Sequence, residues 1–132
     1  MDLAEIAQEI EVLTARLNLM TQRAGPLEAV VDLRRQDVDQ ARQRLNTSQR
    51  LEERFRRIAE RRLGCLHRQE AERQTRRFRE RLARDNENLE TARQQLRDAI
   101  VAVQAEYFVI DELRATLDRL NRELARHRVD LF

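Results

Sequence analysis

The apolar residues of this 132-residue chain recur every three and four positions over most of its length. A 3-4 spacing sustained over many heptads buries one stripe of a helix against another helix, which is the pattern of a coiled coil. The sequence therefore predicts long paired helices. We call the repeating residues the seam positions. In the first half they are Leu3, Ile6, Ile10, Leu13, Leu17, Met20, Ala24, Leu27, Val31, Arg34, Val38, Ala41, Leu45 and Ser48. In the second half they are Thr75, Phe78, Leu82, Asp85, Leu89, Ala92, Leu96, Ala99, Val103, Glu106, Ile110, Leu113, Leu117, Leu120, Leu124, His127 and Leu131.

The composition fits long helices. Charged residues make up 38% of the chain and aromatic residues 4%, and there are only two glycines and one proline. Large apolar side chains and turn residues are too scarce for a globular α/β or all-β core. Ala, Leu, Glu, Gln and Arg dominate, and these residues have high helix propensity. Disorder is the competing interpretation of such a polar chain, but disordered segments lack a sustained apolar stripe.

Gly64 lies almost at the midpoint, between the two heptad stretches. We expect a tight turn over residues 63–66 that folds a helix at residues 66–131 back onto a helix at residues 2–63. Two long helices joined by a short turn must run antiparallel. The prediction is an all-α protein with a single coiled-coil domain over residues 1–132, a long two-helix antiparallel hairpin.

Gly25-Pro26 interrupts the first predicted helix. Proline lacks a backbone donor and its ring clashes with the preceding turn, so we expect the helix to be kinked or broken there. Leu27 and Val31 keep the heptad phase of the preceding residues, which favours a kinked but continuous helix. The alternative is a separate helix over residues 2–24, with Pro26 in the first turn of the next helix. The chain would then form a small elongated three-helix bundle.

The expected turn also predicts which residues face each other. A hairpin folded about residues 64 and 65 places residue i opposite residue 129 − i. This pairing sets Arg44 near Asp85 and Arg23 near Glu106, so two acidic seam positions would each meet an arginine. Polar groups in a coiled-coil seam reduce stability but fix the register. We therefore predict a unique register that contains these two contacts.

No catalytic motif is visible. The sequence has no glycine-rich phosphate loop, no HExxH motif and no CxxC pair. Cys65 is the single cysteine, which excludes an intrachain disulfide. His67 and His127 are too far apart in sequence to share a helix face, and one Cys and two His are too few for a usual metal site. We expect a protein that is not an enzyme and that binds no cofactor, metal or small-molecule substrate.

We also expect a cytoplasmic protein. The opening residues, Met1 to Glu5, carry neither the basic segment nor the apolar segment of a secretory signal. No apolar run approaches the ~20 residues that a transmembrane helix requires.

Arginine is concentrated around the predicted turn. Residues 50–84 contain 13 Arg and 6 acidic residues, a net charge of +7, whereas the whole chain carries +2. Pairs of Arg and Glu on a solvated helix face explain much of the local mixing, but they do not explain this segregation. A basic end favours an acidic protein surface or nucleic acid as the partner. The candidate partner-binding residues are Arg56, Arg57, Arg61, Arg62, Arg73, Arg76 and Arg77.

Between residues 99 and 110 the apolar side chains extend beyond the seam positions. A two-helix coiled coil buries only its seam, so the remaining members would form an exposed patch, and such patches usually mark interaction sites. Two interpretations stay open: the first helix covers the patch near Gly25-Pro26, or the patch binds a second copy or another protein. The candidate interface residues are Ile100, Val101, Tyr107, Phe108 and Val109.

An Arg- and Gln-rich chain of this length, with two long heptad stretches and a turn at Gly64, resembles the FliJ/YscO family. These are the stalk proteins of flagellar and type III secretion export ATPases. The resemblance covers nearly the whole chain and is one of architecture. It implies a stiff helical rod, similar to the central shaft of rotary ATPases, that sits in an ATPase ring and contacts an export gate.

Three functions therefore stay open. The first is a non-enzymatic helical rod for protein–protein interaction, with an export-apparatus stalk as its specific form. The second is a structural or scaffold coiled coil that homo-oligomerises through the patch at residues 99–110. The third is an Arg-rich tip that binds acidic surfaces or nucleic acid, although the modest net charge of +2 argues against nucleic acid.

Overall fold

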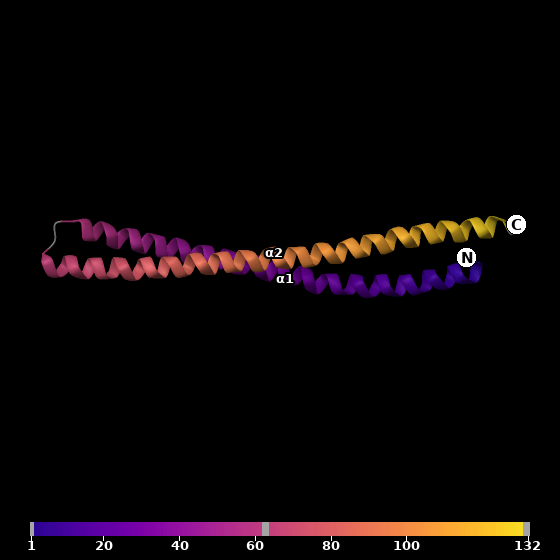
Figure 1. Cartoon of the computed structure of the whole chain (residues 1–132), viewed down its shortest axis with the longest axis horizontal. Coiled ribbons are helices and arrows are strands. Elements are labelled where there is room, and N and C mark those ends of the chain that lie inside the picture. Colours follow the sequence, from indigo (N-terminus) through magenta and orange to yellow (C-terminus); the bar gives the residue numbers. More distant parts are fainter. Residues whose placement is uncertain (1, 62–63, 131–132) are drawn as a thin grey trace. The chain divides into compact units, whose positions relative to one another are not determined.

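The computed structural model describes residues 2–61 and 64–130, apart from the side chains of residues 65, 66, 129 and 130. This part of the chain forms two α-helices and no strand (Figure 1). Helix α1 spans Leu3–Glu60 and helix α2 spans Cys65–Asp130. The predicted all-α hairpin of two long helices is confirmed, and the alternative of a three-helix bundle is wrong.

The predicted helix boundaries at residues 63 and 131 lie outside the described residues, as does part of the turn predicted at 63–66. Among the described residues, α1 already ends at Glu60, and α2 begins at Cys65, within the predicted turn and one residue before the predicted start of the second helix. The described flanks of the turn show how each helix ends. The Arg61 N–H donates to the Ile58 carbonyl at 3.2 Å, which tightens the end of α1. The Gly64 carbonyl accepts from the Arg68 N–H at 3.0 Å, so Gly64 caps the start of α2. Its φ angle is not positive, and the glycine is therefore not used as a left-handed turn residue.

The N-terminus of α1 is closed by a capping box. The Glu5 N–H donates to the Asp2 carboxylate at 2.8 Å, and the Asp2 N–H approaches the Glu5 carboxylate at 3.4 Å. The reciprocal contacts occupy backbone donors that have no partner within the helix. The first residue of α1 is consequently Leu3.

Helix α1 is continuous through Gly25-Pro26. The alternative of a separate first helix is therefore wrong. Pro26 has no N–H to donate to the Gln22 carbonyl, so one backbone hydrogen bond is missing at this point. A Cβ added at Gly25 would meet no atom within 4 Å, so close packing does not require glycine here.

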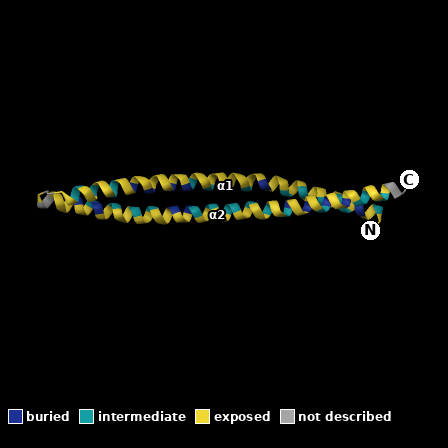
Figure 2. Cartoon of the chain, turned by 90° about the horizontal axis from the view of Figure 1, so that it is seen from above, coloured by how far each residue is buried: buried dark blue, intermediate teal, exposed yellow. Residues whose placement is uncertain are grey.

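The seam predicted from the heptads is confirmed. Every described seam position is buried or half-buried, including the polar ones. Figure 2 shows these residues in blue and teal where the helices face each other, with exposed residues on the outer sides. Contacts divide the helix pair into two units. The terminal unit comprises Met1–Val31 and Ala99–Phe132, and the turn unit comprises Asp32–Asp98.

The two units have separate buried residues. The turn unit has an alanine-rich cluster of Val38, Ala41, Leu45, Leu89 and Ala92, with Leu82 and Leu96 packed against it. The terminal unit buries Ile6, Ala24, Val31, Ile110, Leu113, Leu117 and Leu120. Each core is a single stripe, so the outer surface of each unit is where a partner can bind.

The register of the turn unit differs from the prediction. The rings of Phe55 and Phe78 stack with their centroids 5.1 Å apart, and the Ser48 hydroxyl donates to the Asp85 carboxylate. Both pairs place residue i opposite residue 133 − i, about one helical turn from the predicted relation. The offset is visible in Figure 1, where α2 begins beyond the end of α1. Opposed residues are therefore not those that lie equally far from Gly64 in the sequence. The packing of particular side chains in the seam sets the register instead.

The two contacts predicted from the earlier register are wrong. Asp85 is bonded by Ser48, and Arg44 forms no ion pair with it. In the terminal unit, no ion pair or hydrogen bond joins Arg23 and Glu106, and one carboxylate oxygen of Glu106 is buried without a hydrogen-bond partner among the described residues. Because seam positions recur every three or four residues, the apolar pattern alone accommodates both registers.

Candidate protein-interaction surfaces

Four arginines form one stripe at the C-terminal end of α1, three of them on the helix and the fourth, Arg61, directly after its last residue. They are spaced by four, three and four residues, which places them on one face of the helix. The stripe lines an open surface hollow with a volume of about 500 Å³. We call this surface the basic groove. Its lining residues are Arg50, Glu53, Arg54, Arg57, Ile58 and Arg61.

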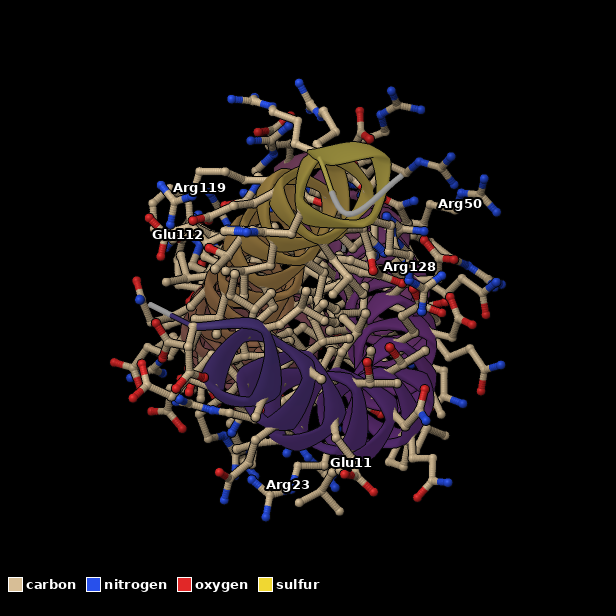
Figure 3. The ribbon with its side chains drawn as sticks, turned by 90° about the vertical axis from the view of Figure 1, so that its right-hand side faces the viewer. Glu11, Arg23, Arg50, Glu112, Arg119 and Arg128 are labelled. Carbon is tan, nitrogen blue, oxygen red and sulfur yellow. The ribbon has the colours of Figure 1, made fainter. Side chains whose placement is uncertain are left out.

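The basic groove carries an excess of positive charge. Arg57 Nη2 lies 2.7 Å from Glu53 Oε1, so the single acidic residue of the groove is already paired. Arg50, Arg54 and Arg61 are exposed and form no ion pair with any residue that the structure describes. Figure 3 shows the Arg50 side chain pointing away from the helices. Three guanidinium groups are therefore available to an anionic partner.

Both helices of the turn unit line a second hollow, of about 460 Å³. Its charges are more nearly balanced. Arg68 lies 3.6 Å from Glu72, and Arg79 lies 3.2 Å from Glu52 on the opposite helix. The Glu52 side chain is only 12% exposed, so its charge is held close to the seam. An anionic partner is expected to prefer the basic groove. The second hollow is lined by Arg56, Ala59, Glu60, Arg68, Glu72, Thr75, Arg76 and Arg79.

The predicted partner-binding arginines do not form one cluster. Arg57 and Arg61 lie in the basic groove, and Arg56 and Arg76 line the second hollow. The sequence therefore identified residues from both surfaces without separating them.

Three more of these arginines lie elsewhere. Arg73 lies 3.6 Å from Glu70, Arg77 is exposed, and Arg62 lies outside the described residues. Arg50 and Arg54 of the basic groove are not among the partner-binding residues predicted from the sequence. Their spacing from Arg57 was the signal that could have identified them.

The predicted apolar interface residues belong to α2 in the terminal unit. Val101 and Phe108 are 61% and 64% exposed, so α1 does not cover them. Tyr107 is 38% exposed, whereas Ile100 and Val109 are half-buried. The structure therefore separates two outward-facing apolar residues from three that are partly covered.

Tyr107 connects the two helices of the terminal unit. Its hydroxyl donates a hydrogen bond to the Glu28 carboxylate on α1. This bond, followed by desolvation and the negative charge of Glu28, raises the pKa of Tyr107 above 10.0. The carboxylate holds the phenolic proton, because ionisation of the phenol would place two negative charges side by side.

We expect the single tyrosine to titrate above its ordinary pKa in the folded protein and at that value in denaturant. Since the folded state holds the proton more tightly, this group's contribution to stability is complete below pH 10 and is lost as the pH rises through the folded pKa. Spectrophotometric titration of tyrosinate measures both states. Glu28→Gln is expected to lower the folded pKa towards the ordinary value, whereas Glu112→Gln leaves it unchanged. Equal effects of the two variants would contradict the assignment.

Other kinds of site are not visible in the described part of the chain. No helix there is long and apolar enough to cross a membrane. No group of three or more His, Cys, Asp or Glu side chains within it is arranged to hold a metal ion. In comparisons with known proteins, no family model, no curated protein and no solved structure matches the chain. The surfaces of the two units are therefore the features from which the function is inferred.

Proposed function

We propose that this protein is a non-enzymatic helical protein-interaction module whose basic groove binds an acidic segment of a partner protein. The observation that carries the proposal is the stripe of Arg50, Arg54 and Arg61, exposed together in a hollow whose one carboxylate is already paired. The turn unit as a whole is also more basic than the rest of the chain. Residues 32–98 contain 19 Arg and 13 acidic residues, a net charge of +6, and the rest of the chain carries −4.

The geometry of the groove suits an acidic helix. Arg50 and Arg57 are seven residues apart, which corresponds to about 10 Å along α1, and Arg61 follows directly after the helix. A helix with carboxylates spaced by three and four residues presents charges at the same intervals. Guanidinium groups bind carboxylates through two parallel hydrogen bonds, which gives orientation as well as attraction. Ile58 adds an apolar contact between the charged positions.

An acidic protein fits this surface better than nucleic acid. Single-stranded nucleic acid is usually held by exposed aromatic side chains on which bases stack. In the turn unit, Phe55 and Phe78 stack on each other and are half-buried, so their faces are not available to bases. Acidic residues interrupt the arginines on both helices, which would repel a continuous phosphate backbone.

A specific form of this proposal is a cytoplasmic stalk of a flagellar or type III secretion export apparatus. The resemblance to the FliJ/YscO family in length, heptad pattern and mid-chain turn supports it. The partner of the basic groove would then be an acidic surface of the export ATPase ring, and a second contact would be made with the export gate. Stiffness of the paired helices is the property that such a stalk needs.

Charge reversal in the groove tests the proposal. We expect Arg54→Glu/Arg61→Glu to weaken binding of a synthetic helical peptide with Glu at i,i+4 spacing by at least about tenfold, since each charge contact is worth on the order of 1 kcal/mol. Fluorescence anisotropy of the labelled peptide measures the affinity, and circular dichroism checks that helicity is kept.

The control makes the same change in net charge elsewhere in the turn unit. Arg42 and Arg84 are exposed and do not line the groove. Arg42→Glu/Arg84→Glu is expected to lower the affinity for the peptide by less than about threefold, because it acts only through long-range electrostatics. Equal losses in both variants would reject a localised site. Tighter binding of a DNA duplex than of the peptide would favour the nucleic-acid function instead.

A further inference from the structure

The terminal unit contains a segment with almost no charge on either helix. On α1 it comprises Ala24–Val31, and on α2 it comprises Ala99–Ile110. We call these two stretches together the apolar band. They lie side by side, because Tyr107 on α2 donates a hydrogen bond to Glu28 on α1. Arg23 precedes the α1 stretch and Asp111 and Glu112 follow the α2 stretch, and Figure 3 shows the Arg23 and Glu112 side chains pointing outwards.

Two carboxylates lie within the band, the exposed Glu28 and the half-buried Glu106. Glu28 accepts the hydroxyl of Tyr107. Glu106 occupies a seam position, and one of its carboxylate oxygens is buried without a hydrogen-bond partner among the described residues. The remaining surface of the band is apolar or uncharged.

The exposed residues of the band form continuous strips. On α2, Val101, Ala105 and Phe108 are spaced by four and three residues, so they follow one outer face of the helix. On α1, Pro26 and Val30 are spaced by four, and Val30 is 39% exposed. The side chains with the largest exposed fractions are Val101 and Phe108, at 61% and 64%.

We propose that two copies of this chain associate through the apolar band. This interface is separate from the basic groove and goes beyond the proposed binding of an acidic partner. The exposed apolar surface of the band is at most on the order of 500 Å², since Phe108 and Tyr107, at 64% and 38% exposure, together present about 150–250 Å² and the smaller exposed residues supply the rest. Two copies would remove up to about 1,000 Å² from water, which meets the lower bound for a specific protein interface.

The low charge of the band is compatible with a second copy of the chain as its partner. Like charges facing each other across a two-fold interface oppose association, and the outer strip of α2 formed by Val101, Ala105 and Phe108 carries no charged side chain. The one exposed carboxylate of the band, Glu28, accepts the Tyr107 hydroxyl. Exposed aromatic residues with charged residues around them are usual in protein interfaces. Phe108 is the exposed aromatic of the band, three residues from the charged margin at Asp111, and Arg23 and Asp98 lie at other margins.

Analytical ultracentrifugation of the full chain over a range of concentrations tests the proposal. We expect a reversible species of twice the 15.8 kDa chain mass. Val101→Glu/Phe108→Glu is expected to weaken dimerisation at least about 100-fold, because it places four carboxylates in an apolar contact. Circular dichroism of the variant should remain that of the native helix pair, since both side chains are exposed in the single chain.

The matched control is Val12→Glu/Leu19→Glu. Val12 and Leu19 are also exposed apolar residues of the terminal unit, at 55% and 50%, but they lie outside the band. This variant is expected to dimerise like the unaltered chain. Loss of the dimer in both variants, or in neither, would overturn the proposal, as would a monomer at every concentration.

Tyr107 gives an independent readout, because it is the single tyrosine and the chain has no tryptophan. Its fluorescence should become less accessible to acrylamide as the dimer forms, and the Val101→Glu/Phe108→Glu variant should not show this protection. An apolar interface is also expected to persist in high salt, whereas peptide binding in the basic groove should weaken. Failure of one proposal can therefore be distinguished from failure of the other.

Discussion

Replacement of Pro26 by alanine is expected to stabilise the protein by about 2–3 kcal/mol and to raise the midpoint of thermal unfolding by roughly 10 °C. In the structure, Pro26 is an exposed residue in the interior of α1. Alanine restores the backbone hydrogen bond to the Gln22 carbonyl and removes the clash of the ring with the preceding turn. The greater freedom of alanine in the unfolded chain offsets part of this gain.

The sign of the change distinguishes a continuous helix from a broken one. If Pro26 stood in the first turn of a separate helix, its fixed φ angle would favour the fold, and Pro26→Ala would lower the stability. Thermal unfolding followed by circular dichroism measures the difference. Gly25→Ala serves as the control, because an added Cβ meets no atom within 4 Å and the expected gain is only about 0.5–1 kcal/mol.

The sequence was sufficient to predict the helices and the seam. Periodicity over many heptads is a strong signal, and all described seam positions are buried or half-buried as expected. It was also sufficient to favour continuity through Pro26, because the heptad phase before and after it is the same. Burial of Leu27 and Val31 on the same stripe as Ile6 and Ala24 therefore outweighs the local cost of proline.

The register was not predictable from the position of Gly64. A coiled-coil seam tolerates a shift of about one turn, because seam residues meet seam residues in both registers. The selection is made by particular pairs, namely Phe55 with Phe78 and Ser48 with Asp85. Neither pair can be recognised before the helices are placed side by side.

The candidate surfaces were predicted only in part, for the same reason. The concentration of arginine near the turn is visible in the sequence. The ion pair between Arg79 on α2 and Glu52 on α1 is not, because it forms only in the observed register. The exposure of Val101 and Phe108 on α2 was also predicted from the sequence. The contribution of α1 to the exposed apolar band was not predicted, because Pro26 and Val30 fall outside the seam positions and the first helix was expected either to cover the patch or to leave it to a partner.

The last prediction concerns the polar pair within the seam of the turn unit. Ser48 is fully buried, and its hydroxyl donates to the half-buried carboxylate of Asp85. Ser48→Ala is expected to lower the free energy of unfolding by about 1–3 kcal/mol, because the carboxylate loses its partner in a partly desolvated position. Urea denaturation measures the change. Thr47→Ala is the control, since Thr47 is exposed and bonds only to the Gln43 carbonyl of its own helix; its effect should stay within about 0.5 kcal/mol.

Replacement of Asp85, the other member of the pair, is expected to cost less stability than replacement of Ser48. After Asp85→Ala, the Ser48 hydroxyl can turn to the carbonyl four residues earlier, as the Thr75 hydroxyl does with Ala71 at 2.8 Å. The loss should therefore be smaller than that of Ser48→Ala. The double variant Ser48→Ala/Asp85→Ala removes both polar groups from the seam and should be more stable than Ser48→Ala alone, with a coupling of about 1–2 kcal/mol. Strictly additive losses would show that the two side chains are not bonded in solution, and the register argued from them would then be wrong.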